Sequence, residues 1–281
     1  EKAHTMNLGR KGAARMQQDR GQVGISSACF FPTETIHAVQ KLAAWNIPNI
    51  EVFFNSPREL KEDYVQKLAQ ICKQAGIRVA SVHPFTSGSE SLYFFSEYPG
   101  RFEDGLEIYR NYFRAAEILG AQLLVFHGDS PYSKMPLEKG FEQIKQMDLL
   151  AQREYGVSIA YENVVRCRGK DPEYFVKLKE YYPQMKFVLD IKQAIRSGHD
   201  PMEYVRCLGS SIVHVHISDS DEIKDCLPVG SGQMKLEELL KALKERGFCG
   251  TVLQELYRES YEKEEEVLLG YRNLEQLIST L

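Results

Sequence analysis

Short apolar runs alternate with longer amphipathic stretches along most of the chain. The apolar runs are rich in β-branched and aromatic residues and lie at residues 23–28, 49–54, 78–83, 121–127, 157–163, 186–191, 211–218 and 251–256. Most of them are nearly continuous rather than alternating, which is typical of parallel strands that are covered on both faces. The pattern therefore predicts eight buried parallel strands.

Helical periodicity fills the segments between these runs, at residues 33–45, 56–75, 101–119, 137–155, 172–182, 201–208, 236–246 and 261–281. Several of these segments end in a glycine just before the next strand, as expected where a left-handed residue terminates a helix. Eight strand–helix units in residues 22–281 predict a (β/α)8 TIM barrel. A doubly wound α/β sheet is the alternative, but no G-x-G-x-x-G follows the first strand, so its dinucleotide-binding form lacks its best sign.

Composition indicates a globular protein and suggests where its folded domain begins. Hydrophobic residues make up 43% of the chain and charged residues 26%, the balance of a globular protein with ample material for a core. Residues 1–21 are polar and basic and lack the apolar stretch of a secretory signal; part of this segment could derive from cloning. We therefore expect residues 22–281 to form one barrel domain.

Charge and cysteine usage argue against several classes of partner, although a local basic patch stays open. The formal net charge is −4, so no overall field favours nucleic acid. No apolar run approaches the ~20 residues of a membrane span. The six cysteines include no C-x-x-C pair, which favours reduced thiols in a cytoplasmic protein. We expect neither a nucleic acid nor a membrane as partner, and leave a homo-oligomer open.

Polar, metal-capable side chains stand near the carboxyl ends of the predicted strands three to eight. In chain order they are His83, His127, Glu162, Asp190, the pair His214 and His216, and Glu255. In a parallel barrel these strand ends converge on one mouth, which is where active sites are built. One carboxylate at a strand end could be a helix cap, but caps do not explain a series on successive strands.

Four of these residues form a candidate metal site. Glu162, Asp190, His216 and Glu255 are each about one β/α unit apart, so they would come from neighbouring strands. Three carboxylates and one imidazole are a mostly hard, oxygen-rich set that favours Mn²⁺, Mg²⁺ or Co²⁺, with Zn²⁺ as a further candidate. Like charges this close need a divalent ion or raised pKa values to stay together.

Five short motifs in a fixed order carry a family resemblance. They are Tyr161-Glu162-Asn163, Leu189-Asp190-Ile191, His214-Val215-His216-Ile217-Ser218-Asp219, Val229-Gly230-Ser231-Gly232 and Gln254-Glu255-Leu256-Tyr257. With them the chain resembles the sugar phosphate isomerase/epimerase family of xylose isomerase-like TIM barrels. These share an architecture with the endonuclease IV type of DNA-repair enzyme (AP endonuclease family 2 superfamily). The resemblance implies one divalent ion on Glu162, Asp190, His216 and Glu255, with both glutamates also acting as acid/base groups.

The chain departs from the family pattern at three places. Gln193 stands where many members carry a histidine, three residues after the strand-six aspartate. The loop after strand seven contains no histidine, so the three-zinc site of the DNA-repair relatives looks incomplete, although His83 and His127 match zinc-binding positions in them. Glu222 stands where ketose epimerases often hold the substrate with an arginine.

The remaining candidates would contact a substrate: His83, His127, Lys192, Gln193 and His214. Strand alternation turns Lys192 to the same side as Asp190 if the strand continues that far; otherwise Lys192 is a solvated loop lysine. A single histidine such as His83 is more often a hydrogen-bonded wall residue than a ligand. The Gly230-Ser231-Gly232 turn could offer backbone N–H groups to an anion, or be an ordinary turn.

These observations favour a metal-dependent sugar or sugar-phosphate isomerase/epimerase that works by proton transfer through an enediolate. Two other classes stay open: an endonuclease IV-like DNA-repair enzyme and a sugar-binding barrel without turnover.

Overall fold

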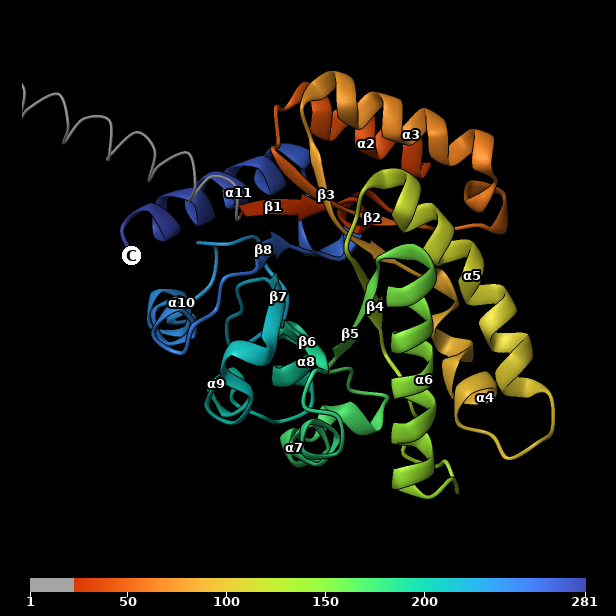
Figure 1. The fold of residues 1–281 in the computed structure, drawn as a ribbon. Helices are drawn as coiled ribbons and strands as arrows, with labels where there is room; N and C mark the ends of the chain where they lie inside the picture. The colour runs from red at the N-terminus through yellow and green to blue at the C-terminus, as the bar shows by residue number, and fades with distance from the viewer. Residues whose placement is uncertain (1–22) are drawn as a thin grey trace, which may run out of the picture.

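The chain folds into a closed barrel of eight parallel strands, drawn as a ribbon in the computed structural model in Figure 1. The structure describes residues 23–281, so the predicted polar segment 1–21 lies outside the described residues. The strands are β1 Val23–Ser26, β2 Asn49–Phe53, β3 Arg78–His83, β4 Leu123–Phe126, β5 Ser158–Glu162, β6 Lys186–Asp190, β7 Ile212–Ile217 and β8 Thr251–Gln254. Each pairs with its neighbours in chain order, and β1 pairs with β8, which confirms the predicted TIM barrel and excludes the doubly wound sheet.

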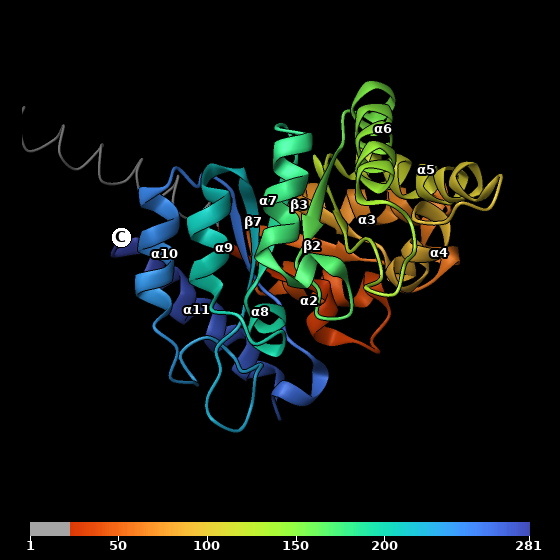
Figure 2. The same ribbon diagram turned by 90° about the horizontal axis from the view of Figure 1, so that it is seen from below.

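Helices surround the barrel on its outside, as the two views together show (Figures 1 and 2). The α-helices are α2 Thr35–Ala44, α3 Glu62–Ala75, α4 Glu90–Phe94, α5 Arg101–Leu119, α6 Leu137–Tyr155, α7 Pro172–Tyr181, α8 Ile191–Arg196, α9 Pro201–Leu208, α10 Leu236–Glu245 and α11 Glu264–Ser279. Short 3-10 turns are η1 Ser27–Phe30, η2 Pro57–Leu60, η3 Phe85–Ser89, η4 Arg168–Lys170, η5 Gly209–Ser211 and η6 Arg258–Ser260. Within residues 23–281, none of the helices has the length and apolar character needed to cross a lipid bilayer.

Two helical details differ from the sequence prediction. The segment expected as one helix over 56–75 is divided into η2 and α3, because Lys61 adopts an extended backbone conformation between them. The short helices α4 and α8 were not predicted, since each replaces a stretch expected as loop or strand end. The helix α8 follows β6 directly, whereas α4 follows β3 after the turn η3.

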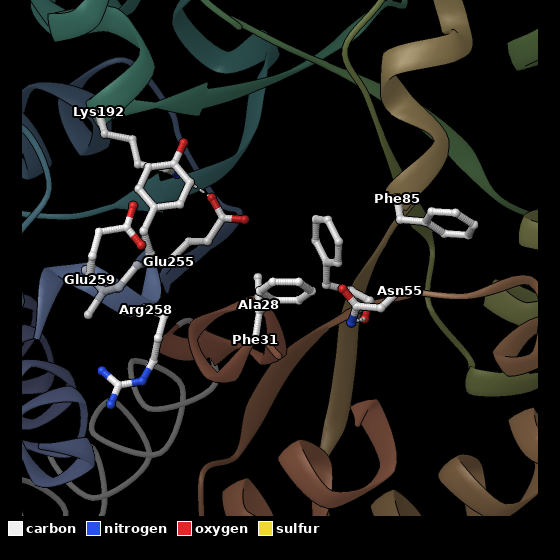
Figure 3. A pocket seen from close by; sticks show the side chains of 11 residues that line it. Ala28, Phe31, Asn55, Phe85, Lys192, Glu255, Arg258 and Glu259 are labelled. Carbon is white, nitrogen blue, oxygen red and sulfur yellow. Dashed lines mark hydrogen bonds and ion pairs between the residues drawn. The ribbon is translucent and has the colours of Figure 1, made fainter. Parts of the chain in front are cut away.

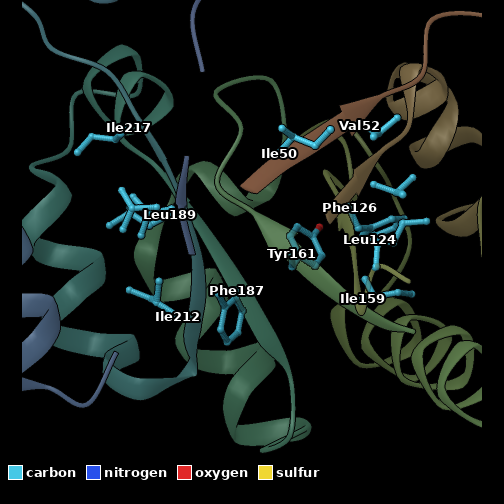
Figure 4. Close-up of a cluster of buried hydrophobic side chains, with 14 of the residues drawn as sticks. Ile50, Val52, Leu124, Phe126, Ile159, Tyr161, Phe187, Leu189, Ile212 and Ile217 are labelled. Carbon is cyan, nitrogen blue, oxygen red and sulfur yellow. The ribbon is translucent and has the colours of Figure 1, made fainter. Parts of the chain in front are cut away.

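Strand alternation separates the core into two parts. Large outward-facing side chains such as Ile159 and Tyr161 pack against the helices (Figure 4). A small inner cluster is made by Val125, Ala160 and Val188. The residues two positions further along β5 and β6 are Glu162 and Asp190, which therefore share the inward face one step nearer the mouth. The apolar cluster thus forms a floor below the polar residues.

Candidate metal centre and active site

The structure brings together the four residues proposed as metal ligands. One potential ligand atom each from Glu162, Asp190, His216 and Glu255 lies within 4.8 Å of the other three. His216 Nδ1 is 2.7 Å from a Glu162 oxygen and 3.4 Å from a Glu255 oxygen. All four side chains are buried, from 1% exposed at Asp190 and His216 to 8% at Glu255. Their function as ligands stays a prediction, but the convergence on which it depends is present.

The donor set at this point suits a divalent cation. Three carboxylates taken out of water repel each other strongly unless positive charge lies among them. The chain itself provides one such charge: the Lys192 ammonium forms ion pairs with Asp190 and Glu255. Oxygen-rich ligands with one imidazole match Mn²⁺, Mg²⁺ or Co²⁺, and a tetrahedral arrangement could hold Zn²⁺. The residues therefore fit the implied metal.

Lys192 points inward, but not for the predicted reason. Strand β6 ends at Asp190, and Ile191 begins α8, so strand alternation does not orient the lysine. Instead, Asp190 Oδ1 accepts a hydrogen bond from the Gln193 backbone N–H at 2.9 Å and caps the helix. This first helical turn directs Lys192 into the mouth, where it is 2% exposed. The alternative of a solvated loop lysine is wrong.

Electrostatics fix the charge of this group of residues. Burial lowers the pKa of Lys192, but the charges of Asp190 and Glu255 raise it well above its ordinary value. Burial raises the pKa of Glu255, yet Lys192 and His216 bring it below its ordinary value. Burial acts the same way on Glu162, whose pKa is nevertheless lowered well below the usual range by His127 and His216. Both glutamates are therefore ionised at neutral pH and able to accept a proton.

Glu51 on β2 is a site residue that the sequence reasoning missed. Its Oε2 atom is 3.0 Å from His216 Nε2, so the imidazole is held from behind while Nδ1 faces the carboxylates. Ser26 and Ser81 donate hydrogen bonds to Glu51 at 2.9 and 2.7 Å. A carboxylate on the far nitrogen of a ligating histidine fixes the ring and raises its basicity. In the sequence, the only sign of this role is that Glu51 is a charged residue inside the apolar run 49–54.

His214 lies behind the site rather than in it. Its Nε2 atom is 3.2 Å from Ser81 Oγ and 3.5 Å from Glu51 Oε2, and the side chain has no exposed surface. Among the described residues, its Nδ1 atom has no hydrogen-bond partner. This position supports Glu51 and offers no contact with the mouth, so it lends no support to the predicted role of His214 in substrate binding.

His83 and His127 form a second cluster that shares Glu162 with the first. His127 Nε2 is 2.7 Å from Glu162 Oε2, and the Nε2 atoms of the two histidines are 3.2 Å apart. On its other side, His127 Nδ1 is 3.0 Å from an Arg166 nitrogen. Burial lowers the pKa of His127 to about 4, so this imidazole is neutral at neutral pH. The cluster could orient a substrate or hold a further ion.

Gln193 uses its whole amide inside the protein. Its oxygen accepts from the Val165 backbone N–H at 3.1 Å, and its nitrogen donates to the Tyr257 hydroxyl at 3.2 Å. The side chain is 8% exposed. It therefore joins the loop after β5 to the segment after β8, and its predicted contact with a sugar hydroxyl would have to compete with these bonds.

The glycine turn after β7 is closed by the protein's own carboxylate. Asp219 Oδ2 accepts hydrogen bonds from the backbone N–H groups of Gly230 and Gly232, both at 3.0 Å. Asp219 Oδ1 accepts from Ser220 and Met234. The anion role considered for this turn is therefore wrong: Asp219 already occupies the N–H groups of both glycines.

A cavity of about 430 Å³ opens beside the four-residue cluster. It is lined by Ala28, Phe31, Phe53, Asn55, Phe85, Lys192, Glu255, Leu256, Tyr257, Arg258 and Glu259. In Figure 3 the charged side chains come from one side of the opening, whereas Ala28, Phe31, Asn55 and Phe85 come from the other. Because Lys192 and Glu255 line the cavity, a molecule bound there reaches the predicted metal ligands directly.

The chain belongs to the xylose isomerase-like TIM barrel family, whose model matches residues 39–277. A relative in Methanocaldococcus jannaschii, an uncharacterised protein, is 24% identical over 244 residues, 82% of this chain and 81% of its own length. The fructoselysine 3-epimerase of Escherichia coli O157:H7 is 32% identical over 97 residues, 34% of this chain and 35% of the epimerase. The family resemblance inferred from the motifs is confirmed.

Solved structures agree with this placement at the level of the fold. A D-tagatose 3-epimerase-like protein superposes with a TM-score of 0.75 at 21% identity, covering 92% of this chain and 97% of its own. The IOLI protein, solved with a bound zinc atom, superposes with a TM-score of 0.75 at 20% identity, covering 92% and 98%. The chain is thus a TIM barrel related to sugar epimerases, with buried His/Glu clusters suited to a metal.

Proposed function

We propose that this protein is a divalent-metal-dependent sugar isomerase or epimerase in which Glu162 and Glu255 transfer protons. The observation that carries the proposal is the buried cluster of Glu162, Asp190, His216 and Glu255, whose ligand atoms lie within 4.8 Å of one another beside a cavity. The epimerase names of several relatives support the same class.

The chemistry follows from the placement of the two glutamates. A bound divalent ion would supply positive charge next to the sugar's carbonyl and hydroxyl oxygens, which makes the neighbouring C–H more acidic. Glu255 lines the cavity and is ionised, so it can take that proton. Glu162, held by His127 and His216, can exchange a proton with the substrate from its own side of the cluster. If the proton returns to the same carbon from the opposite face, the product is the epimer. If the proton is added to the adjacent carbon instead, the product is the isomer.

Metal analysis and isotope exchange test this proposal. We expect one tightly held divalent ion per chain and incorporation of deuterium at carbon when the loaded protein is incubated with a panel of ketoses and aldoses in deuterated water. Glu162→Gln and Glu255→Gln should each lose the ion and the exchange. Glu259→Gln, an exposed carboxylate on the same cavity, is the matched control and should keep both. Full metal occupancy in both site variants would contradict the proposal.

The cluster of His83, His127 and Glu162 favours one second candidate, an endonuclease IV-like enzyme with more than one ion. That enzyme would bind several zinc ions per chain and cleave a duplex containing an abasic site. Gln193, whose amide is bonded within the protein, stands at a position where further metal would need a histidine. Zinc counting together with an abasic-site cleavage assay separates the two candidates. A sugar that binds without deuterium exchange would instead indicate a barrel without turnover.

A further inference from the structure

We propose that Arg166 is a positioning residue: it fixes His127 in the tautomer that carries its proton on Nε2, so that His127 donates a hydrogen bond to Glu162 and is withheld from metal coordination. The tautomer follows from contacts of the chain itself. The limit of one ion per chain also rests on the proposed function, because it takes the four-residue cluster as the metal site.

Arg166 contacts the His127 ring from the loop after β5. One guanidinium nitrogen, Nη2, lies 3.0 Å from His127 Nδ1 and 3.2 Å from Ser87 Oγ, to which it donates. A guanidinium carries N–H donors and no acceptor, and it stays charged at any pH at which the protein is folded. His127 Nδ1 must therefore be the acceptor, because an N–H at that position would point at another N–H. A neutral ring with an unprotonated Nδ1 carries its proton on Nε2.

The contacts on the other side of the ring agree with this assignment. His127 Nε2 is 2.7 Å from Glu162 Oε2 and 3.2 Å from His83 Nε2. An ionised carboxylate only accepts, so Glu162 takes the Nε2 proton of His127. His83 Nε2 can accept as well, because its Nδ1 lies 3.3 Å from the Pro84 carbonyl oxygen and needs the N–H of that ring to bond to it. One arrangement of protons thus satisfies all of these hydrogen bonds.

His127 differs from His83 and His216 in the group behind the ring. A histidine that binds a metal through one nitrogen usually donates the N–H of the other nitrogen to a carboxylate or a carbonyl. The far nitrogen of His216 is 3.0 Å from a carboxylate oxygen, and that of His83 is 3.3 Å from a backbone carbonyl. Behind His127 lies a cation with donors only. To bind an ion through Nε2, a neutral His127 would have to move its proton to Nδ1, against Arg166.

This contrast determines what the cluster of His83, His127 and Glu162 can do. Without His127, the cluster offers two protein ligands to a second ion, whereas zinc sites use three or four. His127 instead holds Glu162 Oε2 while Glu162 Oε1 faces His216 Nδ1 at 2.7 Å. Arg166 therefore acts through His127 to orient one of the proposed acid/base groups. The inference favours an isomerase or epimerase over the endonuclease IV-like candidate.

Nitrogen-15 NMR of the histidine rings tests the tautomer. In the metal-free protein at slightly alkaline pH, we expect the His127 signals, assigned by their loss in His127→Gln, to show a protonated Nε2 and an unprotonated Nδ1. Arg166→Glu places an acceptor behind the ring and should move the proton to Nδ1, whereas Arg166→Lys keeps a cation with donors only and should preserve the natural tautomer. Lys134→Glu makes the same change of charge at an exposed position of the loop after β4 and is the matched control; it should leave the signals unaltered.

Zinc titration measures the consequence for metal binding. We expect the natural protein, Arg166→Lys and Lys134→Glu to hold one Zn²⁺ per chain. Arg166→Glu should bind a second Zn²⁺ at least about tenfold more tightly than the natural protein does, since the outer partner of a ligating histidine changes metal affinity about 10–100-fold. Adding His83→Ala to Arg166→Glu should remove the second ion and keep the first, which separates binding at this cluster from binding to the new carboxylate alone.

The outcomes separate this inference from the proposed function. A proton on His127 Nδ1 in the natural protein, a tautomer unaffected by Arg166→Glu, or two tightly held ions in the natural protein would overturn the inference. If Arg166→Glu does not fold, Arg166→Met removes the donor without adding charge and should lose the preference for the Nε2 proton. Deuterium exchange at carbon is followed in parallel. The expected tautomer and a single ion without exchange would support the inference and count against an isomerase or epimerase, whereas exchange by a protein with the proton on His127 Nδ1 would do the reverse.

Discussion

Replacing Lys192 by methionine should destabilise the metal-free protein and tighten metal binding. The lysine ammonium is 2% exposed and is paired with Asp190 and Glu255, two of the four predicted ligands. Removing one partner of a buried ion pair costs about 3–5 kcal/mol, because the carboxylates remain buried without compensation. For a domain of this size, 1 kcal/mol changes Tm by about 2–4 °C. The lower bound therefore predicts a fall of about 6–12 °C in chelator.

The same substitution changes metal affinity in the opposite direction. A divalent ion that binds among the carboxylates must displace the ammonium in the natural protein but not in Lys192→Met. Recovering about 3 kcal/mol on binding corresponds to an affinity increase of about 100-fold. Competition between the protein and a chelator for Mn²⁺ measures this change. Lys186→Met, which removes a half-buried lysine of β6 that donates a hydrogen bond to Ser158 of β5, is the control and should leave Mn²⁺ affinity unaltered.

Two results would refute this reasoning. An unchanged Kd for Mn²⁺ in Lys192→Met would mean that the ammonium and the ion do not compete for the same carboxylates. A metal-free Tm equal to that of the natural protein would mean that Asp190 and Glu255 do not depend on Lys192 for compensation. Weaker Mn²⁺ binding in Lys192→Met would mean that the lysine helps to hold the carboxylates in place for the ion rather than competing with it.

Three further predictions concern residues around the site. Glu51→Gln should weaken metal binding about 10–100-fold because His216 loses its orienting carboxylate, as a Mn²⁺ titration would reveal; unaltered affinity would remove Glu51 from the site. Burial raises the pKa of Glu90 to about 7, so the folded chain binds a proton that the unfolded chain, with a pKa near 4.5, releases first. The free energy of unfolding should therefore fall by about 3 kcal/mol as pH rises from about 4.5 through about 7. In metal-free Glu90→Gln, the free energy measured by urea unfolding should change less with pH over this range; an identical pH dependence would contradict this. Gly128→Ala should cost about 2 kcal/mol or more, since Gly128 has φ +84° and an added Cβ would meet the Tyr161 hydroxyl at 1.6 Å; thermal unfolding at the natural Tm would disprove the clash.

The barrel and the four predicted ligands were accessible from sequence because each follows a local rule. Continuous apolar runs predict strands buried on both faces, and a polar residue at the end of such a run has little reason to be there except at the mouth. Because side chains alternate between the two faces of a strand, Glu162 shares the inward face with Ala160, and Asp190 shares it with Val188. Local pattern and barrel symmetry together are sufficient for this part of the site.

The remaining features depend on contacts that no local pattern contains. Glu51 contacts His216 across the barrel, and nothing in the sequence around either residue indicates the other. The helix α8 was missed because its first residue, Ile191, continues the apolar run of β6, and only the cap formed by Asp190 separates the two elements. In the same way, the glycine turn after β7 matches an anion loop in sequence, and the position of Asp219 decides against it.

Closure of the ring between β1 and β8 sets the order of events when the protein is made. The last strand is also the one that leads into Glu255, so a growing chain exposes the open edges of an unfinished sheet until residues beyond 254 have been synthesised. A complete set of the four predicted ligands exists only after that point. If these residues hold an ion as proposed, its capture by the full set follows assembly of the barrel.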